Sequence, residues 1–310
     1  MIVIRDLEAF PVLARSIVTS GTFDGVHVGH QKILSRLIET ARQSGGQSVV
    51  VTYWPHPRLV LAPQHVHELR LISTIEERIA HLSAFDLDYL LIIPFTKEFS
   101  SLSPEEYVQK ILLDTLHTKK LVIGYDHHFG RNREGNFEFL RANADRFGFT
   151  IEEIPRQDID EVGVSSTKIR QALEAGEVHQ ASRFLGRPYS LTGTVVEGKQ
   201  LGRTIGYPTA NLQVAEPFKL IPAPGVYAVR VTVEGSSYGA MLNIGFRPTI
   251  GGTSLSIEAH LFNFSGDLYT KEVQVAFVER LRDEQKFGGL DELKAQLAKD
   301  KEAALRIVKS

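Results

Sequence analysis

The chain has 310 residues, which is long for one compact domain and suggests two units that each bury a core. Hydrophobic residues make up 43% and charged residues 23%, a composition that excludes a disordered chain. The net charge of −2 argues against a nonspecific nucleic-acid binder, and the absence of cysteine excludes disulfides, thiolate nucleophiles and cysteine-based zinc sites.

No part of the sequence indicates a targeting or membrane segment. Arg5 and Asp6 interrupt the N-terminal stretch before an apolar run develops, and no stretch approaches the ~20 apolar residues that a membrane span needs. We therefore expect a cytoplasmic protein that acts on small molecules, without nucleic acid or membrane as a partner. Weak self-association stays open.

The first half of the chain alternates apolar, β-branched runs with helical patterns. Strands are predicted at 16–20, 47–53, 88–95, 119–124 and 149–154, and helices at 31–43, 74–84, 104–116 and 137–147. Ser103 followed by Pro104 and two glutamates is typical of a helix start. Strands that alternate with helices predict a Rossmann-like parallel sheet, which we assign to residues 1–185.

After about Phe184 the pattern changes to short alternating runs that are broken by Gly and Pro. Strands are predicted at 190–198, 225–235, 237–245, 254–264 and 272–281. Short strands without intervening helices predict a small antiparallel β-barrel over residues 186–310. Leu293, Leu297 and Leu305 are spaced for one face of a C-terminal helix from about 290 to 308.

The segment GTFDGVHVGH (Gly21–His30) joins the first predicted strand directly to a helix. Its glycines let the backbone approach a phosphate, the helix start favours an anion, and His27 and His30 can donate hydrogen bonds. We expect nucleotide binding by Gly21, Thr22, Phe23, Asp24 and Gly29. A zinc half-site, or a structural histidine pair at a helix start, remains an alternative.

A second segment, VSSTKIR (Val164–Arg170), combines hydroxyl side chains at a helix start with two cations. Hydroxyls, backbone N–H groups and cations together suit a triphosphate. We expect Arg170 to act in catalysis and Ser165, Ser166, Thr167 and Lys168 to bind the nucleotide. Capped helix starts with basic residues are also common as purely structural features.

The second half opens with GKQLGRTIGYPTAN (Gly198–Asn211). The glycine spacing does not fit a Walker P-loop, but Gly198 and Gly202 can form a flap over phosphates. Thr209 and Asn211 face the same way in an extended chain and offer two oxygen ligands for Mg²⁺. The alternative is that this segment is only a turn.

The run SLSIEAHLFNF (254–264) alternates, so that Ile257, Ala259 and Leu261 share one face and Glu258, His260 and Phe262 the other. A carboxylate on the open face of a strand can serve as general base when an alcohol attacks a γ-phosphate. Glu258 can fill that role, but the pattern alone does not assign it. A lone strand glutamate is more often just solvated.

At this point the first half resembles the FAD synthetase family within the HxGH nucleotidyltransferases. The carrying motifs are GTFDGVHVGH, VSSTKIR, WPHPR (Trp54–Arg58) and GYDHHFG (Gly124–Gly130). The resemblance implies that Pro55, Pro57 and Asp126 border the flavin, although WPHPR alone fits a rigid loop after a strand. His127 departs from the aromatic residue that the family has at its position.

The second half resembles the riboflavin kinase family through GYPTAN, NIGFRPT (Asn243–Thr249), EAHLFNF and LRDEQKFGGLDELKAQLAKD. That family implies a six-stranded barrel, Mg-ATP held through Thr209 and Asn211, Glu258 as base and Arg282 near the flavin. Thr270 departs from a glycine that is common in the family.

Both motif sets occur in the order found in bifunctional prokaryotic FAD synthetases. The resemblance therefore implies ATP-dependent phosphorylation of riboflavin to FMN and then adenylylation of FMN to FAD, with ATP, riboflavin and FMN as substrates and Mg²⁺ as cofactor. A chain with one degenerate site and a flavin-sensing or flavin-storing protein are the alternatives. An oxidoreductase is disfavoured because no GxGxxG fingerprint follows a strand.

Overall fold

The structure is a computed structural model that describes residues 1–310 except 63, 65–68, 156–162, 199–200, 250–251 and 310. The chain divides into two compact units, Met1–Ser166 and Thr167–Ser310, and each is described here by itself. Among the described residues, no helix is both long and apolar enough to cross a membrane.

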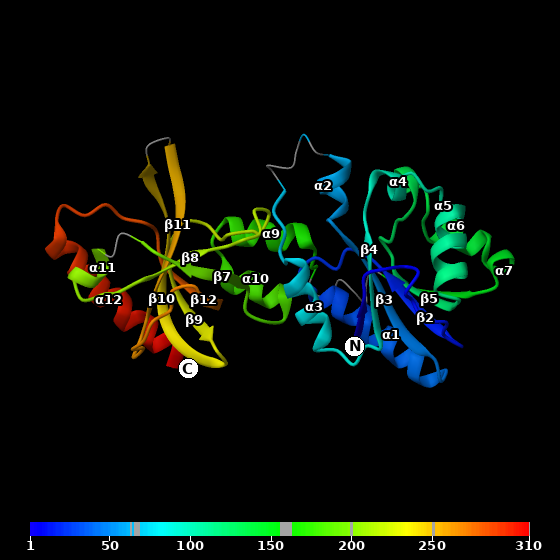
Figure 1. The fold of residues 1–310 in the computed structure, drawn as a ribbon, viewed down its shortest axis with the longest axis horizontal. Helices are drawn as coiled ribbons and strands as arrows, with labels where there is room; N and C mark the ends of the chain where they lie inside the picture. Colours follow the sequence, from blue (N-terminus) through cyan, green and yellow to red (C-terminus); the bar gives the residue numbers. More distant parts are fainter. Residues whose placement is uncertain (63, 65–68, 156–162, 199–200, 250–251, 310) are drawn as a thin grey trace. The chain divides into compact units, whose positions relative to one another are not determined.

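The first unit is built on a six-stranded sheet in the order β1-β4-β3-β2-β5-β6. Figure 1 labels its strands β2, β3, β4 and β5. All of its strand pairs are parallel. The strands are β1 (Ile2–Ile4), β2 (Ser16–Ser20), β3 (Gln47–Trp54), β4 (Tyr89–Pro94), β5 (Thr118–Gly124) and β6 (Thr150–Ile154). This confirms the predicted Rossmann-like sheet and adds β1, whose three residues are too few to show a strand pattern.

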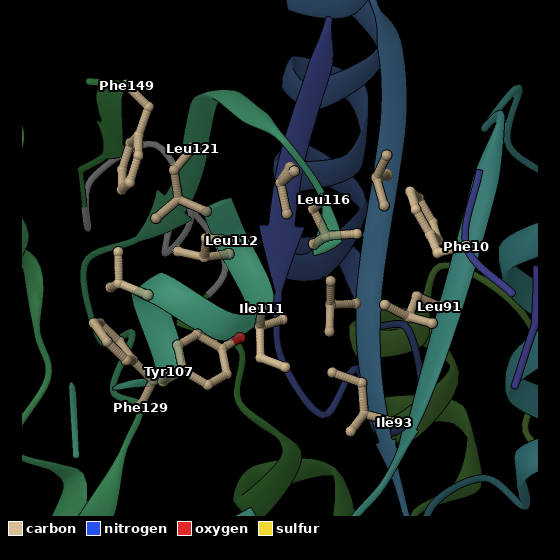
Figure 2. Packing of buried hydrophobic residues seen from close by; sticks show 14 of the residues in the cluster. Phe10, Leu91, Ile93, Tyr107, Ile111, Leu112, Leu116, Leu121, Phe129 and Phe149 are labelled. Carbon is tan, nitrogen blue, oxygen red and sulfur yellow. The ribbon is translucent and has the colours of Figure 1, made fainter. Parts of the chain in front are cut away.

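Helices cover both faces of this sheet because its central strands are apolar on both sides. One core packs Ile17, Val50 and Leu90 against α1 (Val28–Gln43) and α3 (Ile75–Ser83). The other core packs the alternate strand residues, such as Leu91 and Leu121, against Tyr107, Ile111 and Leu112 (Figure 2). The other helices among the described residues of this unit are α2 (Pro57–Leu61), α4 (Lys97–Ser100), α5 (Pro104–Tyr107), η2 (Val108–Thr115), η3 (Arg131–Arg133), α6 (Phe137–Ala142) and α7 (Ala144–Phe147).

The helix predicted at 104–116 begins as its sequence indicates. Ser103 caps α5, and its side chain and that of Glu106 form a reciprocal capping box. The helix then continues with π-helical geometry as η2 and ends at Thr115. The helix predicted at 137–147 is broken into α6 and α7 at Asn143, whose backbone angles are not helical.

The second unit contains a closed antiparallel barrel in the order β10-β11-β8-β7-β12-β9. Its strands are β7 (Ser190–Val196), β8 (Ala210–Gln213), β9 (Gly225–Val233), β10 (Ser236–Thr249), β11 (Gly252–Leu261) and β12 (Glu272–Arg282). Helix α12 (Leu290–Lys309) packs Ala304 and Val308 against Met241 and Phe262. The predicted barrel and C-terminal helix are confirmed.

Two helices precede the barrel, α9 (Ser166–Glu174) and α10 (Val178–Leu185), and the short α11 (Leu201–Thr204) follows β7. From Thr167 onward these helices belong to the second compact unit. The Leu173 carbonyl accepts a hydrogen bond from Ala223 N, and α10 contacts β12. The sequence pattern predicts a domain boundary at 185/186, whereas the compact units divide at 166/167. The boundary between independently folding fragments stays a prediction.

Candidate active sites

In the first unit, the segment after β2 is a loop whose backbone is held by its own buried aspartate. The Asp24 carboxylate accepts hydrogen bonds from Ile72 N (3.2 Å), Ser73 N (3.0 Å) and Ser73 Oγ (3.2 Å). Gly25 N donates to Ser73 Oγ at 3.0 Å. Asp24 therefore ties the loop Gly21–Asp24 to the segment that enters α3.

The same loop carries two non-glycine residues in the left-handed region. Phe23 has φ 47° and Val26 has φ 42°, and both side chains are buried. A β-branched residue rarely adopts this conformation, so the surrounding packing must hold it. Such strain is typical of a functional loop, and the sequence pattern did not reveal it.

His27 and His30 lie together at the start of α1. His27 is the N-cap residue and its Nδ1 accepts a hydrogen bond from His30 N at 3.3 Å. The two rings stack with centroids 3.6 Å apart and planes within 15°. Because Nδ1 of His27 accepts, a neutral His27 ring carries its proton on Nε2 and can donate to an anion.

The zinc alternative for these histidines needs further ligands. Among the described residues, no group of three or more His, Cys, Asp or Glu side chains could hold a metal ion. Gly29, which lies between the two histidines in the sequence, is buried on the first turn of α1. The arrangement of helix start, histidine donor and close backbone instead fits a phosphate group.

The segment VSSTKIR meets the loop through its second serine. Ser166 begins α9, and its Oγ donates to the Asp24 carbonyl at 3.2 Å, so the two predicted nucleotide segments of the first unit touch at this point. Ser165 immediately precedes the helix. Thr167, Lys168 and Arg170 follow on the first turns of α9 and belong to the second unit.

A buried polar cluster lies at the carboxyl ends of β2 and β3, beside the segment that follows β5. Ser20 Oγ lies 2.8 Å from His127 Nε2, and the hydroxyls of Tyr53 and Tyr107 lie 2.8 Å apart. Burial raises the pKa of both tyrosines. Burial also lowers the pKa of His127 to about 4, so its ring is neutral at pH 7.

In open α/β sheets, ligands bind outside the carboxyl ends of the strands, which is where this cluster lies. The predicted flavin residues are at the same edge. Asp126 is exposed beside His127, and Pro55 and Pro57 follow the end of β3, where Pro57 starts α2 behind the His56 N-cap. The sequence analysis missed Ser20, Tyr53 and Tyr107, because only their burial together distinguishes them from ordinary core residues.

In the second unit, a cavity of about 320 Å³ opens on the barrel. Its lining includes Thr209, Asn243, Glu258, His260, Arg282 and Phe287. Glu258 is half-buried on β11, between its register partners Asn211 on β8 and Asn243 on β10. Directly opposed residues of a sheet share a face, so a carboxylate and two amides form one polar row.

The glycine-rich segment lies against this row. A Cβ added to Gly198 would lie 2.1 Å from Asn211 Nδ2, and one added to Gly202 would lie 2.2 Å from the Tyr207 carbonyl oxygen. At Gly202, where the near atom is a backbone oxygen, only a residue without a side chain permits this approach; at Gly198 a side chain would displace the Asn211 amide. The structure thus brings the predicted flap glycines next to the predicted metal ligands Thr209 and Asn211.

Arg282 is held at the wall of the cavity by α12. Its Nε and Nη2 bind the Asp300 carboxylate at 3.0 and 2.7 Å, and Gln296 Nε2 donates to the same carboxylate at 2.8 Å. The Arg282 side chain is 15% exposed and that of Asp300 only 4%. This fork orients Arg282 towards the cavity, 5.8 Å from the centre of the Phe287 ring.

His260 is a cavity residue whose function the sequence analysis did not assign. Its Nδ1 lies 2.8 Å from the Pro208 carbonyl, and because a carbonyl only accepts, Nδ1 carries the proton. Burial lowers its pKa, which favours the neutral ring. His260 thereby fixes the residue that precedes Thr209, and its position two residues after Glu258 was the available signal.

Comparisons with known proteins agree with both motif sets. The family model for FAD synthetase matches residues 10–168, and that for riboflavin kinase matches residues 185–308. The bifunctional riboflavin kinase/FMN adenylyltransferase of Pseudomonas fluorescens is 40% identical over 93% of this chain and 91% of its own length. The protein of the same description from Haemophilus influenzae is 37% identical over 98% of each chain.

A crystal structure described as a macrolide-efflux protein from Streptococcus pneumoniae is also similar, with 34% identity, a TM-score of 0.89 and coverage of 98% of both chains. Its description speaks of efflux for that protein only. The curated relatives and both family models agree with each other over nearly the whole length of this chain. The chain therefore belongs to the family of bifunctional riboflavin kinase/FMN adenylyltransferases.

Proposed function

We propose that the barrel unit phosphorylates riboflavin to FMN, and that the parallel-sheet unit, with the start of α9, adenylylates FMN to FAD. Family membership gives the two activities and their substrates ATP, riboflavin and FMN. The proposal concerns which residues perform each step. The observation that supports it most is the row Asn211, Glu258 and Asn243, of which Glu258 and Asn243 line the barrel cavity, far in sequence from the loop Gly21–Asp24.

In the kinase step, Glu258 acts as general base. Its carboxylate takes the proton of the terminal ribityl hydroxyl of riboflavin while that oxygen attacks the γ-phosphorus of ATP, and ADP leaves. Arg282, which Asp300 orients at the cavity wall, borders the flavin in this proposal. Gly198 and Gly202 let the backbone close over the ATP phosphates.

Thr209 at the cavity and Asn211, the register partner of Glu258, fit a magnesium ion. Mg²⁺ prefers hard oxygen ligands, and the hydroxyl of Thr209 and the amide oxygen of Asn211 are two such groups beside a carboxylate. Thr209 and Asn211 would hold the ion together with the ATP phosphates. Bound there, Mg²⁺ supplies neutralisation of the charge that develops on the transferred phosphoryl group.

The adenylylation step needs no protein nucleophile, because the FMN phosphate is already an anion. One of its oxygens attacks the α-phosphorus of ATP, the bond to the β-phosphate breaks, and pyrophosphate leaves. His27, His30 and Arg170 donate to the phosphate oxygens as negative charge develops. Gly21, Thr22, Phe23, Asp24 and Gly29 shape the loop, Ser165, Ser166, Thr167 and Lys168 bind the triphosphate, and Pro55, Pro57 and Asp126 border the flavin.

The proposal includes a cytoplasmic enzyme that works on small molecules, without nucleic acid; self-association stays open. Incubation with riboflavin, ATP and Mg²⁺, followed by chromatography of the flavins, should show FMN first and FAD second. FMN supplied directly with ATP should give FAD and pyrophosphate. FMN as the end product would instead indicate a chain with one degenerate site, and no turnover at all would indicate a flavin-storing protein.

A further inference from the structure

The first unit holds an arginine that no step above uses. Arg78 lies on α3 with none of its surface exposed, and it is the largest fully buried side chain among the described residues. Its Nη1 donates to Thr52 Oγ1 at 3.1 Å and to the Tyr53 carbonyl at 3.3 Å. Its Nε and Nη2 are buried without a hydrogen-bond partner in the described part of the chain.

The positive charge of Arg78 is also not matched by an ion pair with any described residue. The nearby carboxylate is that of Asp24, whose charge raises the pKa of Arg78 while burial lowers it. The Asp24 carboxylate oxygens accept hydrogen bonds from Ile72 N, Ser73 N and Ser73 Oγ. An arginine stays charged in a protein, so Arg78 is a buried and incompletely compensated cation, which is costly unless an anion offsets it.

A chain of two hydrogen bonds connects Arg78 to the phosphate loop. Thr52 Oγ1 accepts from Arg78 Nη1 and donates to the Thr22 carbonyl at 3.1 Å. Thr22 belongs to the loop Gly21–Asp24, and Asp24 ties that loop to the residues just before the helix of Arg78. The guanidinium is therefore coupled to the loop both through Thr52 and through α3.

We infer that Arg78 is a positioning residue of the first site: its buried charge and its link to Thr22 set up the loop Gly21–Asp24 for the pyrophosphate part of ATP. The bound phosphates supply the negative charge that offsets the Arg78 guanidinium. Low polarity around Arg78 strengthens this attraction, because buried charges are screened less than exposed ones. The inference rests on the proposed function of the first unit.

The chain provides its own reporter for a test. Trp54 is its only tryptophan, and its ring centre lies 5.8 Å from the Arg78 guanidinium carbon. Tryptophan emission during a titration with inorganic pyrophosphate thus reports on the first unit without turnover. Arg78→Met removes the charge, Arg78→Lys keeps it, and Thr52→Val keeps the charge but breaks the link to Thr22. Arg146→Met is the matched control, because it removes an exposed arginine on α7 of the same unit.

Arg78→Met should weaken pyrophosphate binding by at least about 10-fold, and Thr52→Val should weaken it by less. The pyrophosphate affinity of Arg78→Lys should stay within about 3-fold of that of the native protein. Arg146→Met should bind as the native protein does. Urea unfolding followed by Trp54 emission shows whether the first unit of each variant is folded. Riboflavin phosphorylation by the other unit should be unchanged in all four. Thr52→Val and Arg78→Lys keep the test decisive if Arg78→Met does not fold.

Native pyrophosphate affinity in Arg78→Met, or an equal loss in Arg146→Met, would overturn the inference. FMN binding is measured separately by the fluorescence of the flavin. An Arg78 variant that loses affinity for FMN but not for pyrophosphate would also overturn the inference, because the anion that offsets the charge of Arg78 would then not be the nucleotide. Absence of any pyrophosphate binding by the native protein overturns it as well. Failure of the native protein to make FAD while it binds pyrophosphate would count against the proposed function and not against Arg78.

Discussion

Glu258 of β11 lies directly opposite Asn211 of β8 in the antiparallel register of the barrel. The two residues are 47 positions apart in the numbering (258 − 211), and only the closure of the barrel makes them neighbours. Asn243 of β10 flanks Glu258 on the other side. The proposed base and a proposed metal ligand thus share one face, on which we propose that an alcohol and a γ-phosphate meet.

Glu258→Gln should lower riboflavin phosphorylation by ~10²-fold or more, because it keeps the volume and hydrogen bonding of the side chain but removes the basic carboxylate. Adenylylation of FMN should persist, since its residues lie in other parts of the chain. Separate assays with riboflavin and with FMN as substrate measure the two rates. A Glu258→Gln protein that phosphorylates riboflavin at the native rate would show that Glu258 is only a solvated strand residue.

Asn211→Ala should raise the Mg²⁺ concentration that gives half-maximal kinase activity, because one of the two proposed oxygen ligands is lost. The Mg²⁺ requirement of adenylylation serves as the internal control and should not change. An exposed amide of the first unit, Gln43 at the end of α1, provides the matched variant Gln43→Ala. An unaltered Mg²⁺ requirement in Asn211→Ala would leave the segment GYPTAN as a structural turn.

The predicted secondary structure rested on strong local patterns, and those patterns were sufficient for most elements. β1 and β8 were missed because they have three and four residues, which is too short for an alternating pattern to stand out. The break between α6 and α7 was missed because it depends on the backbone of Asn143 alone. The strand pattern predicted a small antiparallel barrel, but its six strands followed only from the resemblance.

For the sites, motif spacing indicated the residues whose chemistry is visible in one segment, such as His27 and Glu258. It could not indicate Arg78 or Tyr107, because a buried arginine or tyrosine is identical in sequence to an exposed one. Arg282 followed from the resemblance, but the fork with Asp300 that orients it requires the packing of α12. These relationships belong to tertiary structure, and the identities of neighbouring residues do not encode them locally.

The acid sensitivity of the first unit should depend on His127. Its pKa is lowered to about 4 in the folded protein by burial, whereas an unfolded histidine titrates near 6.5. Below about pH 6.5 the His127 ring of the unfolded chain binds a proton, whereas the ring in the folded protein does so only near pH 4. The free energy of unfolding therefore decreases as the pH falls through that window. The loss from about pH 7.5 to about pH 5 should be roughly 2 kcal/mol for this group.

His127→Gln should flatten this loss, because the amide can replace the bond to Ser20 but does not titrate in this range. Urea unfolding followed by Trp54 emission, at both pH values, gives the free energy of unfolding of the first unit. An equal loss of stability in the native protein and in His127→Gln would show that other groups control the acid response.

The two helices before the barrel should matter for a separate kinase fragment. Val178, Ala181, Phe184 and Leu185 of α10 are buried, and Tyr189 N donates to Ser182 Oγ at 3.4 Å. A fragment of residues 167–310 should therefore be more stable than one of residues 186–310, by about 2 kcal/mol for each large buried side chain that is retained. Thermal unfolding of both fragments measures this difference.

Both fragments should lack FMN adenylylation, and the longer one should phosphorylate riboflavin. Equal stability of the two fragments would place the folding boundary at 185/186, as the sequence pattern predicts. A longer fragment that is folded by circular dichroism but inactive as a kinase would contradict the assignment of that activity to the barrel.

His30→Ala should have the opposite effect to Glu258→Gln. It removes the proposed donor to the transferring phosphate of the first site, and loss of such a donor typically costs ~10²–10³ in rate. Riboflavin phosphorylation should continue, so FMN should accumulate. General destabilisation would instead lower both rates together and would lower the melting temperature. Unchanged FAD formation in a stable His30→Ala protein would make this histidine structural.

The most direct test of two independent sites on one chain is to mix these two variants. Glu258→Gln alone should make FAD only from FMN, and His30→Ala alone should convert riboflavin only as far as FMN. The mixture, supplied with riboflavin, ATP and Mg²⁺, should produce FAD at a rate approaching that of the native protein, because free FMN passes from one variant to the other. No FAD from the mixture, while each variant performs its remaining step alone, would contradict the account.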